Sequence, residues 1–233
     1  MRLVLFDIDG TLLSASGAGR RAMHRALLEV YGTAGPIDSY DFHGKTDPGI
    51  VRDLMRAAGL PPAAVAGGEP GFYARYLEHL EREIGDGQGV RLYSGVAPLV
   101  EALAATERCL VGLLTGNIEG GARLKLRSTG LWPRFRVGAY GSDDADRTRL
   151  PAVAAGRAEA LVRRAFRGAD LVIVGDTPLD VGCGRAFGAA CVAVATGRHT
   201  VADLAACGPD HVFADLSDTD RVLTAILDGA AGE

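Results

Sequence analysis

Short apolar runs alternate with helical patterns along most of the chain. The first run, residues 3–6, has four apolar residues without a polar break, which is typical of a strand buried on both faces of a parallel sheet. Similar runs predict further strands at residues 109–114, 137–140, 170–175, 191–195 and 211–213. Helical patterns lie around them at residues 98–105, 120–129, 150–166, from 178 onward, and 218–227. Strands that alternate with helices predict an α/β fold with a doubly wound parallel sheet.

One long segment shows helical patterns and no strand. Its three amphipathic stretches lie at residues 20–31, 47–59 and 72–84. Asp47 and Pro48 predict the N-cap and first turn of the second helix. We expect residues 14–91 to form a helical subdomain, the cap, inserted into a core of residues 1–13 and 92–233. The last five residues are expected to be frayed.

Composition and charge exclude several classes of protein. The chain has 233 residues and a net charge of -4 at pH 7, which argues against a nucleic-acid surface. Its apolar runs are too short to span a bilayer. We expect no signal peptide, because a predicted strand follows the first residues directly. Four widely spaced cysteines without a C-x-x-C pair argue against a zinc or redox motif and favour buried, reduced thiols. We therefore expect a cytoplasmic protein, monomeric or homodimeric, without nucleic-acid or membrane partners.

Polar residues gather where the predicted strands end. Asp7 and Asp9 follow the first strand and point to the same side by alternation. Two crowded carboxylates are costly unless a cation or a bound proton relieves them. Thr115 and Asn117 follow a second strand, and Asp176 follows a third. Because ligands bind beyond the carboxyl ends of the strands in an open parallel sheet, these distant residues are expected to share one cleft.

Three motifs together resemble those of the haloacid dehalogenase-like (HAD) hydrolase superfamily. They are Asp7-Ile-Asp9-Gly10-Thr11, Leu114-Thr115-Gly116-Asn117 and Val174-Gly175-Asp176-Thr-Pro-Leu-Asp180, and they look like its motifs one, two and four. The helical insertion after the first motif resembles the type-one cap of that superfamily. The resemblance covers nearly the whole chain and implies a Rossmann-like core in an enzyme similar to the phosphoglycolate phosphatases.

The resemblance implies roles in phosphoester hydrolysis. Asp7 would attack phosphorus and form an aspartyl-phosphate, while Asp9 would protonate the leaving group and then activate water. The hydroxyl of Thr115 and the backbone amide of Gly116 would hold phosphate oxygens, with Asn117 beside them.

Magnesium is the cofactor that the resemblance implies. The carboxylate of Asp7, the backbone carbonyl of Asp9 and the carboxylate of Asp176 would hold it. Asp180 would support this metal site, often through water. Asp180 also stands at the third position of a helix that Thr177 and Pro178 would begin, so a capping role is open beside the metal role.

Motif three departs from the family pattern, which usually places a lysine there to stabilise the phosphorylated aspartate. Residues 142–151 contain no lysine. Arg147 is the expected substitute and Arg149 the alternate, because a guanidinium binds phosphate through two hydrogen bonds. A solvated charged loop is the other interpretation.

The cap residues 42–47 resemble the substrate-facing loop of phosphoglycolate-phosphatase-like members. Lys45 is accordingly either a ligand for a substrate carboxylate or phosphate, or a solvated turn residue. The main hypothesis is a magnesium-dependent phosphatase acting on a small phosphorylated metabolite, of the phosphoglycolate or sugar-phosphate type. Two alternatives stay open: a sugar phosphomutase, although residues 17–20 lack the usual histidine, and a degenerate, non-catalytic phosphate-binding regulator.

Overall fold

The computed structural model describes residues 1–228, so the expected fraying of residues 229–233 lies outside the described part. Its centre is a six-stranded sheet in the order β5-β4-β1-β6-β7-β8, with every neighbouring pair parallel. The strands are β1 (Arg2–Phe6), β4 (Cys109–Thr115), β5 (Val137–Tyr140), β6 (Leu171–Gly175), β7 (Ala190–Val194) and β8 (His211–Phe213). Strand β1 pairs with β4 on one side and β6 on the other. The acids that follow β1 therefore stand at the middle of the sheet edge.

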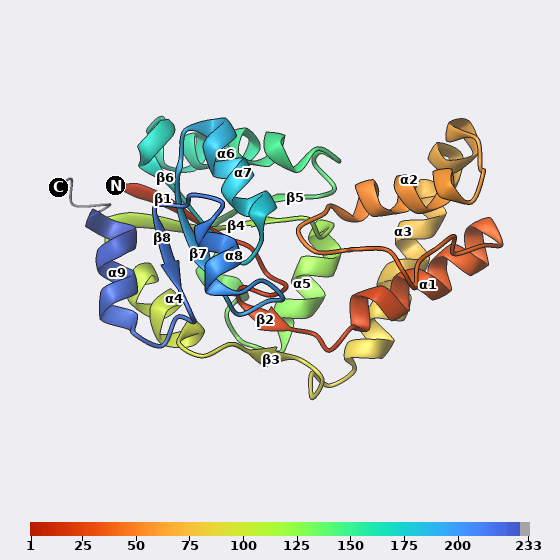
Figure 1. Ribbon diagram of the computed structural model, residues 1–233, viewed down its shortest axis with the longest axis horizontal. Coiled ribbons are helices and arrows are strands. Elements are labelled where there is room, and N and C mark those ends of the chain that lie inside the picture. Colours follow the sequence, from red (N-terminus) through yellow and green to blue (C-terminus); the bar gives the residue numbers. More distant parts are fainter. Residues whose placement is uncertain (229–233) are drawn as a thin grey trace.

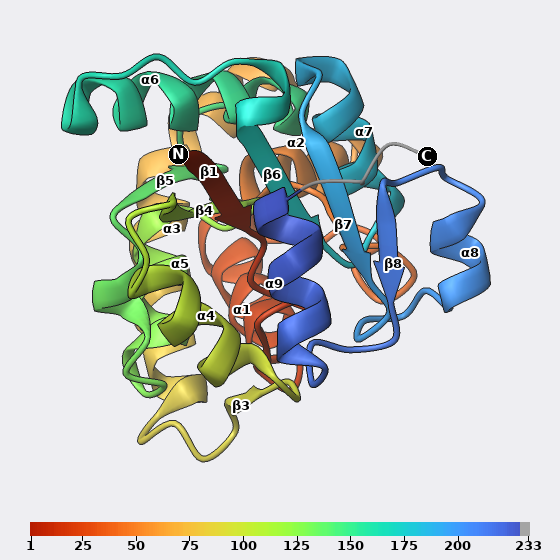
Figure 2. The ribbon, with the colours of Figure 1, turned by 90° about the vertical axis from the view of Figure 1, so that its left-hand side faces the viewer.

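Helices cover both faces of this sheet (Figure 2). One face carries α4 (Val96–Ala104), α5 (Glu119–Arg127) and α9 (Thr219–Asp228), and the other carries α6 (Leu150–Val162) and α7 (Pro178–Phe187). Alternate residues of β1 supply the two cores: Val4 and Phe6 pack on the first face, Leu3 and Leu5 on the second. The expected doubly wound α/β fold is confirmed. A short helix that the sequence pattern did not predict, α8 (Val201–Ala205), lies beside β8.

The segment expected to be the cap consists of three helices beyond the carboxyl ends of the strands (Figure 1). They are α1 (Ala18–Tyr31), α2 (Asp47–Ala57) and α3 (Pro62–Ile84). A short antiparallel pair, β2 (Leu13–Ser14) with β3 (Arg91–Leu92), forms the connection to the core. The division into a core domain and a cap domain stays a prediction.

One local expectation about the cap helices was wrong, and one helix extends beyond its apolar stripe. The N-cap of α2 is Thr46, whose hydroxyl accepts a 3.1 Å hydrogen bond from the amide of Gly49. Asp47 is instead the first helical residue. Helix α3 begins ten residues before the apolar stripe at residues 72–84 and contains Pro70. Its first turns are rich in alanine and glycine, so they carry almost no apolar stripe that would reveal them.

The cysteines are free thiols, as expected. Cys109, Cys183 and Cys191 are buried, whereas Cys207 is half-buried. No helix within residues 1–228 is both long and apolar enough to cross a membrane.

Candidate active site

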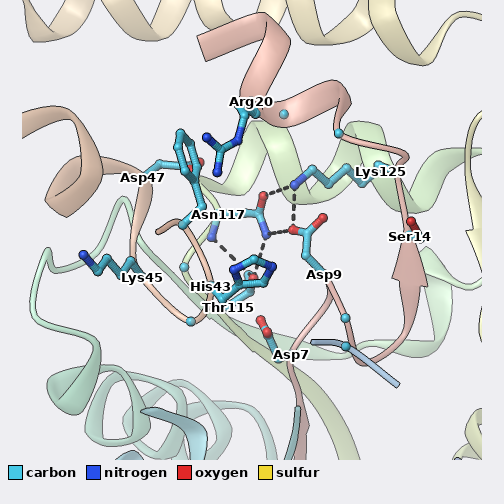
Figure 3. A pocket seen from close by; sticks show the side chains of 18 of the residues that line it. Asp7, Asp9, Ser14, Arg20, His43, Lys45, Asp47, Thr115, Asn117 and Lys125 are labelled. Atoms are coloured by element: carbon cyan, nitrogen blue, oxygen red, sulfur yellow. Dashed lines mark hydrogen bonds and ion pairs between the residues drawn. The ribbon is translucent and has the colours of Figure 1, made fainter. Parts of the chain in front are cut away.

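A cavity of about 440 Å³ lies between the cap helices and the carboxyl edge of the sheet. The core contributes Asp7, Asp9 and Thr115 to its wall, and the cap contributes residues such as His43 and Ile50. Figure 3 shows that the side chains of motifs one and two converge there. The structure thus brings together residues that are more than a hundred positions apart.

Three buried carboxylates form a candidate metal site. Asp7, Asp176 and Asp180 each offer one oxygen, and these oxygens all lie within 4.8 Å of one another. Oδ1 of Asp176 accepts a 2.9 Å hydrogen bond from the hydroxyl of Thr11, while Oδ2 is buried and has no partner among residues 1–228. A buried, unpartnered carboxylate oxygen is costly, and hard divalent cations prefer such oxygens. The donor set therefore fits Mg²⁺.

The crowding of these acids alters their protonation. Burial, together with the charges of Asp180 and Asp7, raises the pKa of Asp176 to about 8. Burial likewise raises the pKa of Asp7 to about 6, although the nearby Arg147 cation opposes the shift. In the absence of a cation, Asp176 therefore holds a proton near neutral pH, which a bound metal would displace.

Gly10 of motif one allows the backbone to approach Asp176 closely. A Cβ atom at this position would lie only 2.3 Å from Oδ2 of Asp176, and the φ angle of Gly10 is +89°. Both observations require glycine, because an L side chain would collide with the carboxylate and strain the backbone.

Arg147 is the basic residue that reaches Asp7. It begins a short 3₁₀ turn, Arg147–Arg149, and its Nη2 atom lies 3.2 Å from Oδ1 of Asp7 and 2.6 Å from Oδ1 of Asp180. Burial disfavours its cation, but the two carboxylates outweigh this effect and raise the pKa of Arg147. Arg149 points outward with a 70% exposed side chain and pairs with Asp144 and Asp146. Of the two arginines, the structure therefore places Arg147 in the site.

Asp180 makes contacts that fit both roles expected for it, helix capping and support of the metal site. Its Oδ2 atom accepts hydrogen bonds from the amide and the hydroxyl of Thr177, at 3.0 Å and 2.7 Å, which completes a capping box at the start of α7. Its Oδ1 atom accepts from Arg147. Capping thus fixes the carboxylate that lies beside Asp7 and Asp176.

Asp9 lies in a different set of contacts from Asp7. Its Oδ2 atom accepts a 2.6 Å hydrogen bond from Nζ of Lys125 and a 2.8 Å bond from Nδ2 of Asn117. Lys125 also donates to Oδ1 of Asn117 at 2.6 Å (Figure 3). The lysine comes from α5 and is buried. Asn117 therefore joins the two charged groups.

Asn117 also orients the hydroxyl of Thr115. Oγ1 of Thr115 accepts from Nδ2 of Asn117 at 2.8 Å and from its amide at 3.3 Å. Because the oxygen accepts these bonds, its own proton is left for an acceptor in the cavity. A phosphate oxygen is such an acceptor.

The cap touches motif two through its loop before α2. The amide of Asp47 donates to the carbonyl of Gly116 at 2.7 Å, and Oδ2 of Asp47 accepts from the amide of Ile118 at 2.9 Å. Burial raises the pKa of Asp47 to about 6, against the opposing charge of Lys125. A second contact joins Asp41 of the cap to Arg198 of the core at 2.9 Å. The cap loop thus forms part of the cavity wall in this structure.

Lys45 lies in the wall of the cavity, but its amine does not contact Asp7 or Asp9. Its Nζ atom donates to the hydroxyl of Tyr40 at 2.9 Å, lies over that ring at 4.1 Å and is 4.0 Å from Asp53. Figure 3 shows the side chain turned away from Asp7 and Asp9. The tyrosine and the aspartate hold the amine on the cap, and a role of Lys45 toward the substrate stays a prediction.

The comparison with protein families decides the classification. A model described as haloacid dehalogenase-like hydrolase matches residues 4–185. The chain belongs to this family. A second model, described as HAD-hydrolase-like, matches residues 152–219. The expected family and the expected class of enzyme, a phosphoric monoester hydrolase, are thereby confirmed.

Individual relatives agree with this classification. The phosphoglycolate phosphatase of Rhodospirillum rubrum is 30% identical over 224 residues, which cover 93% of this chain and 90% of the relative. That of Xylella fastidiosa is 32% identical over 188 residues, or 80% of this chain and 77% of the relative. The crystal structure of a hydrolase from Pseudomonas syringae superposes with a TM-score of 0.72 at 19% identity, covering all of both chains. This structural likeness shows the shared fold.

In this haloacid dehalogenase-like hydrolase, sequence reasoning missed Lys125. The search for a basic partner was confined to the loop before α6, whereas Lys125 lies on α5, eight residues after Asn117. A signal was present: the buried face of α5 consists of Gly121, Ala122, Lys125 and Leu126. A lysine on an otherwise apolar stripe is uncommon unless it is paired.

Proposed function

We propose that this haloacid dehalogenase-like hydrolase is a magnesium-dependent, cytoplasmic phosphatase. It hydrolyses a small phosphorylated metabolite, of the phosphoglycolate or sugar-phosphate type, through an aspartyl-phosphate on Asp7. The placement of Asp7 carries the proposal: its carboxylate lines the cavity, lies within 4.8 Å of two other carboxylates and has Arg147 at 3.2 Å. A nucleophile for phosphorus needs this combination of a cation site and a second positive group.

The metal would be held by the carboxylates of Asp7 and Asp176 and by the backbone carbonyl of Asp9, with Asp180 in support. When bound, Mg²⁺ supplies charge neutralisation for the phosphoryl oxygens and for the acids. The unpartnered Oδ2 atom of Asp176 and the clustering of the three acids support this assignment.

The first chemical step is the transfer of the phosphoryl group to Asp7. A carboxylate oxygen of Asp7 forms a bond to phosphorus, and the bond between phosphorus and the ester oxygen breaks. Asp9 gives its proton to the departing oxygen. The hydroxyl of Thr115 donates to a phosphoryl oxygen, and Arg147 balances the charge beside Asp7.

The second step releases phosphate. Asp9, now a carboxylate, takes a proton from water, whose oxygen attacks phosphorus. The bond between phosphorus and Asp7 breaks, and the carboxylate of Asp7 is restored. The same acid thus serves both steps, which requires Asp9 to keep one oxygen accessible to the cavity.

Size and similarity support a small substrate. The cavity of about 440 Å³ lies within the range of small-molecule sites, and the cap loop forms part of its wall. Two relatives at 30% and 32% identity carry the name phosphoglycolate phosphatase. A small phosphorylated acid is therefore the first substrate to examine.

Phosphate release from a panel of phosphorylated acids, sugar phosphates and nucleotide monophosphates tests the proposal. We expect release with Mg²⁺, loss of release with a chelator, and at least about a thousandfold lower turnover in Asp7→Asn. A folded wild-type protein that releases phosphate from no member of the panel would contradict the proposal. Isomerisation of a sugar phosphate without release would identify a mutase instead.

A further inference from the structure

Lys125 lies in the wall of the cavity but belongs to none of the family motifs quoted above. Its side chain is only 6% exposed. A buried ammonium is costly unless it is paired and hydrogen-bonded. Both contacts of its amine, Asp9 and Asn117, belong to motifs one and two. The lysine is therefore part of the site and not an accidental neighbour.

These contacts determine how Asp9 faces the cavity. Oδ2 receives hydrogen bonds from both Lys125 and Asn117. Among residues 1–228, no hydrogen bond engages Oδ1, and the side chain of Asp9 is 45% exposed where it lines the cavity. One carboxylate oxygen is thus held in place while the other is available for proton transfer.

We propose that Lys125 is the positioning residue for the acid–base steps of Asp9. This inference rests on the proposed phosphatase function. Each acid of motif one has its own cation: Arg147 lies beside Asp7, and Lys125 lies beside Asp9. Lys125 holds the Asp9 carboxylate in the orientation from which its free oxygen reaches the leaving group and the attacking water. A carboxylate that rotates freely would spend most of its time in orientations that do not transfer a proton.

The test compares Lys125→Met with Lys125→Arg and with Arg123→Met. The last variant is a matched control, because Arg123 is a cation on the same helix α5, its side chain is 63% exposed and it lies outside the cavity wall. We expect Lys125→Met to lower kcat by about 10- to 100-fold with KM changed by less than about threefold. Lys125→Arg should restore part of the loss, and Arg123→Met should stay within about twofold of wild type.

A second measurement separates positioning from general damage to the fold. The leaving group of 4-nitrophenyl phosphate departs without protonation, so the first step persists when Asp9 is misplaced, whereas the attack of water slows. Phosphoenzyme should therefore accumulate in Lys125→Met above the wild-type level. In an Asp9→Asn background, Lys125→Met should cost less than about threefold, since it acts through the same residue.

The inference is overturned if Lys125→Met keeps the wild-type kcat. It is also overturned if kcat falls without phosphoenzyme and without rescue by arginine, or if the two substitutions combine additively. Lys125→Gln, which keeps a donor for Asn117 but no charge, is measured alongside, so the result does not depend on the folding of one variant. A wild-type protein without turnover would instead contradict the proposed function. Wild-type turnover with an unaffected Lys125→Met would contradict only this inference.

Discussion

The Nζ atom of Lys125 lies 2.6 Å from Oδ2 of Asp9, although the two residues are 116 positions apart in the chain. The contact joins α5 to the end of β1 across the wall of the cavity. This contact gives Asp9 a cationic partner different from that of Asp7. Asp7 lies beside Arg147 and belongs to the carboxylate cluster. Two acids only two residues apart thus lie in different electrostatic environments, as different chemical roles require.

Removal of Arg147 should damage both stability and turnover. Arg147→Ala leaves Asp7 and Asp180 buried without their cation, which typically costs about 3–5 kcal/mol, and it removes the positive charge beside the nucleophile. We expect a clear fall in Tm and at least about a hundredfold fall in kcat. Arg149→Ala is the control, because that side chain is exposed and should change stability by less than about 0.5 kcal/mol. Wild-type values for Arg147→Ala in calorimetry and kinetics would show that the arginine has no such role.

The stability of the metal-free protein should fall as the pH rises. An aspartate in an unfolded chain has a pKa near 3.9, whereas burial raises that of Asp176 in the folded protein to about 8. Between these values the folded state holds a proton that the unfolded state has lost, so its stability decreases with increasing pH. Asp7 and Asp47, with pKa values of about 6, act in the same direction.

Thermal denaturation with a chelator at pH 5.5 and pH 8 measures this effect. We expect a lower Tm at pH 8 and a larger gain from Mg²⁺ there, because metal binding requires the deprotonated acids. In Asp176→Asn, the gain from Mg²⁺ should disappear and the pH dependence should weaken. A Tm that rises with pH, or an equal gain from Mg²⁺ at both pH values, would be inconsistent with the carboxylate cluster as a metal site.

Gly116→Ala should loosen the contact between the cap and motif two. A Cβ atom at Gly116 would lie 2.0 Å from the carbonyl oxygen of Lys45, so the cap loop must move away. We expect a loss of about 1–3 kcal/mol in stability and a reduced kcat/KM. Gly156→Ala is a suitable control, because this exposed glycine in α6 has no atom within 4 Å of its Cβ position, and alanine there should stabilise the helix. Equal effects of both substitutions would rule out the close approach as the cause.

The arrangement of motifs one, two and four could be predicted from sequence because strand ends determine it. Each motif directly follows an apolar run, and parallel strands align their carboxyl ends at one edge of the sheet. The side chains of these motifs lie close to the strand end, so the backbone of the strand determines their position. The placement of Asp7, Thr115 and Asp176 therefore needed no knowledge of distant packing.

Other features depend on contacts that the local pattern does not contain. The amine of Lys125 lies at the end of a long side chain, and its partner Asp9 comes from the segment after β1, which is 116 positions away in the chain. The direction of Lys45 depends on Tyr40 and Asp53 in the folded cap. Thr46 and Asp47 are both good N-cap residues, and the choice between them depends on the amide of Ile118, which binds Asp47. Tertiary contacts decide all three cases.

The central claim is that Asp7 is the nucleophile and carries the phosphoryl group during turnover. Asp9→Asn is the informative variant, because it should allow attack by Asp7 on 4-nitrophenyl phosphate but block the attack of water on the intermediate. Mass spectrometry of the acid-quenched, digested variant should find one phosphoryl group on the peptide that contains Asp7. A phosphoryl group on another residue, or Asp7→Asn protein that turns over at the wild-type rate, would contradict the account.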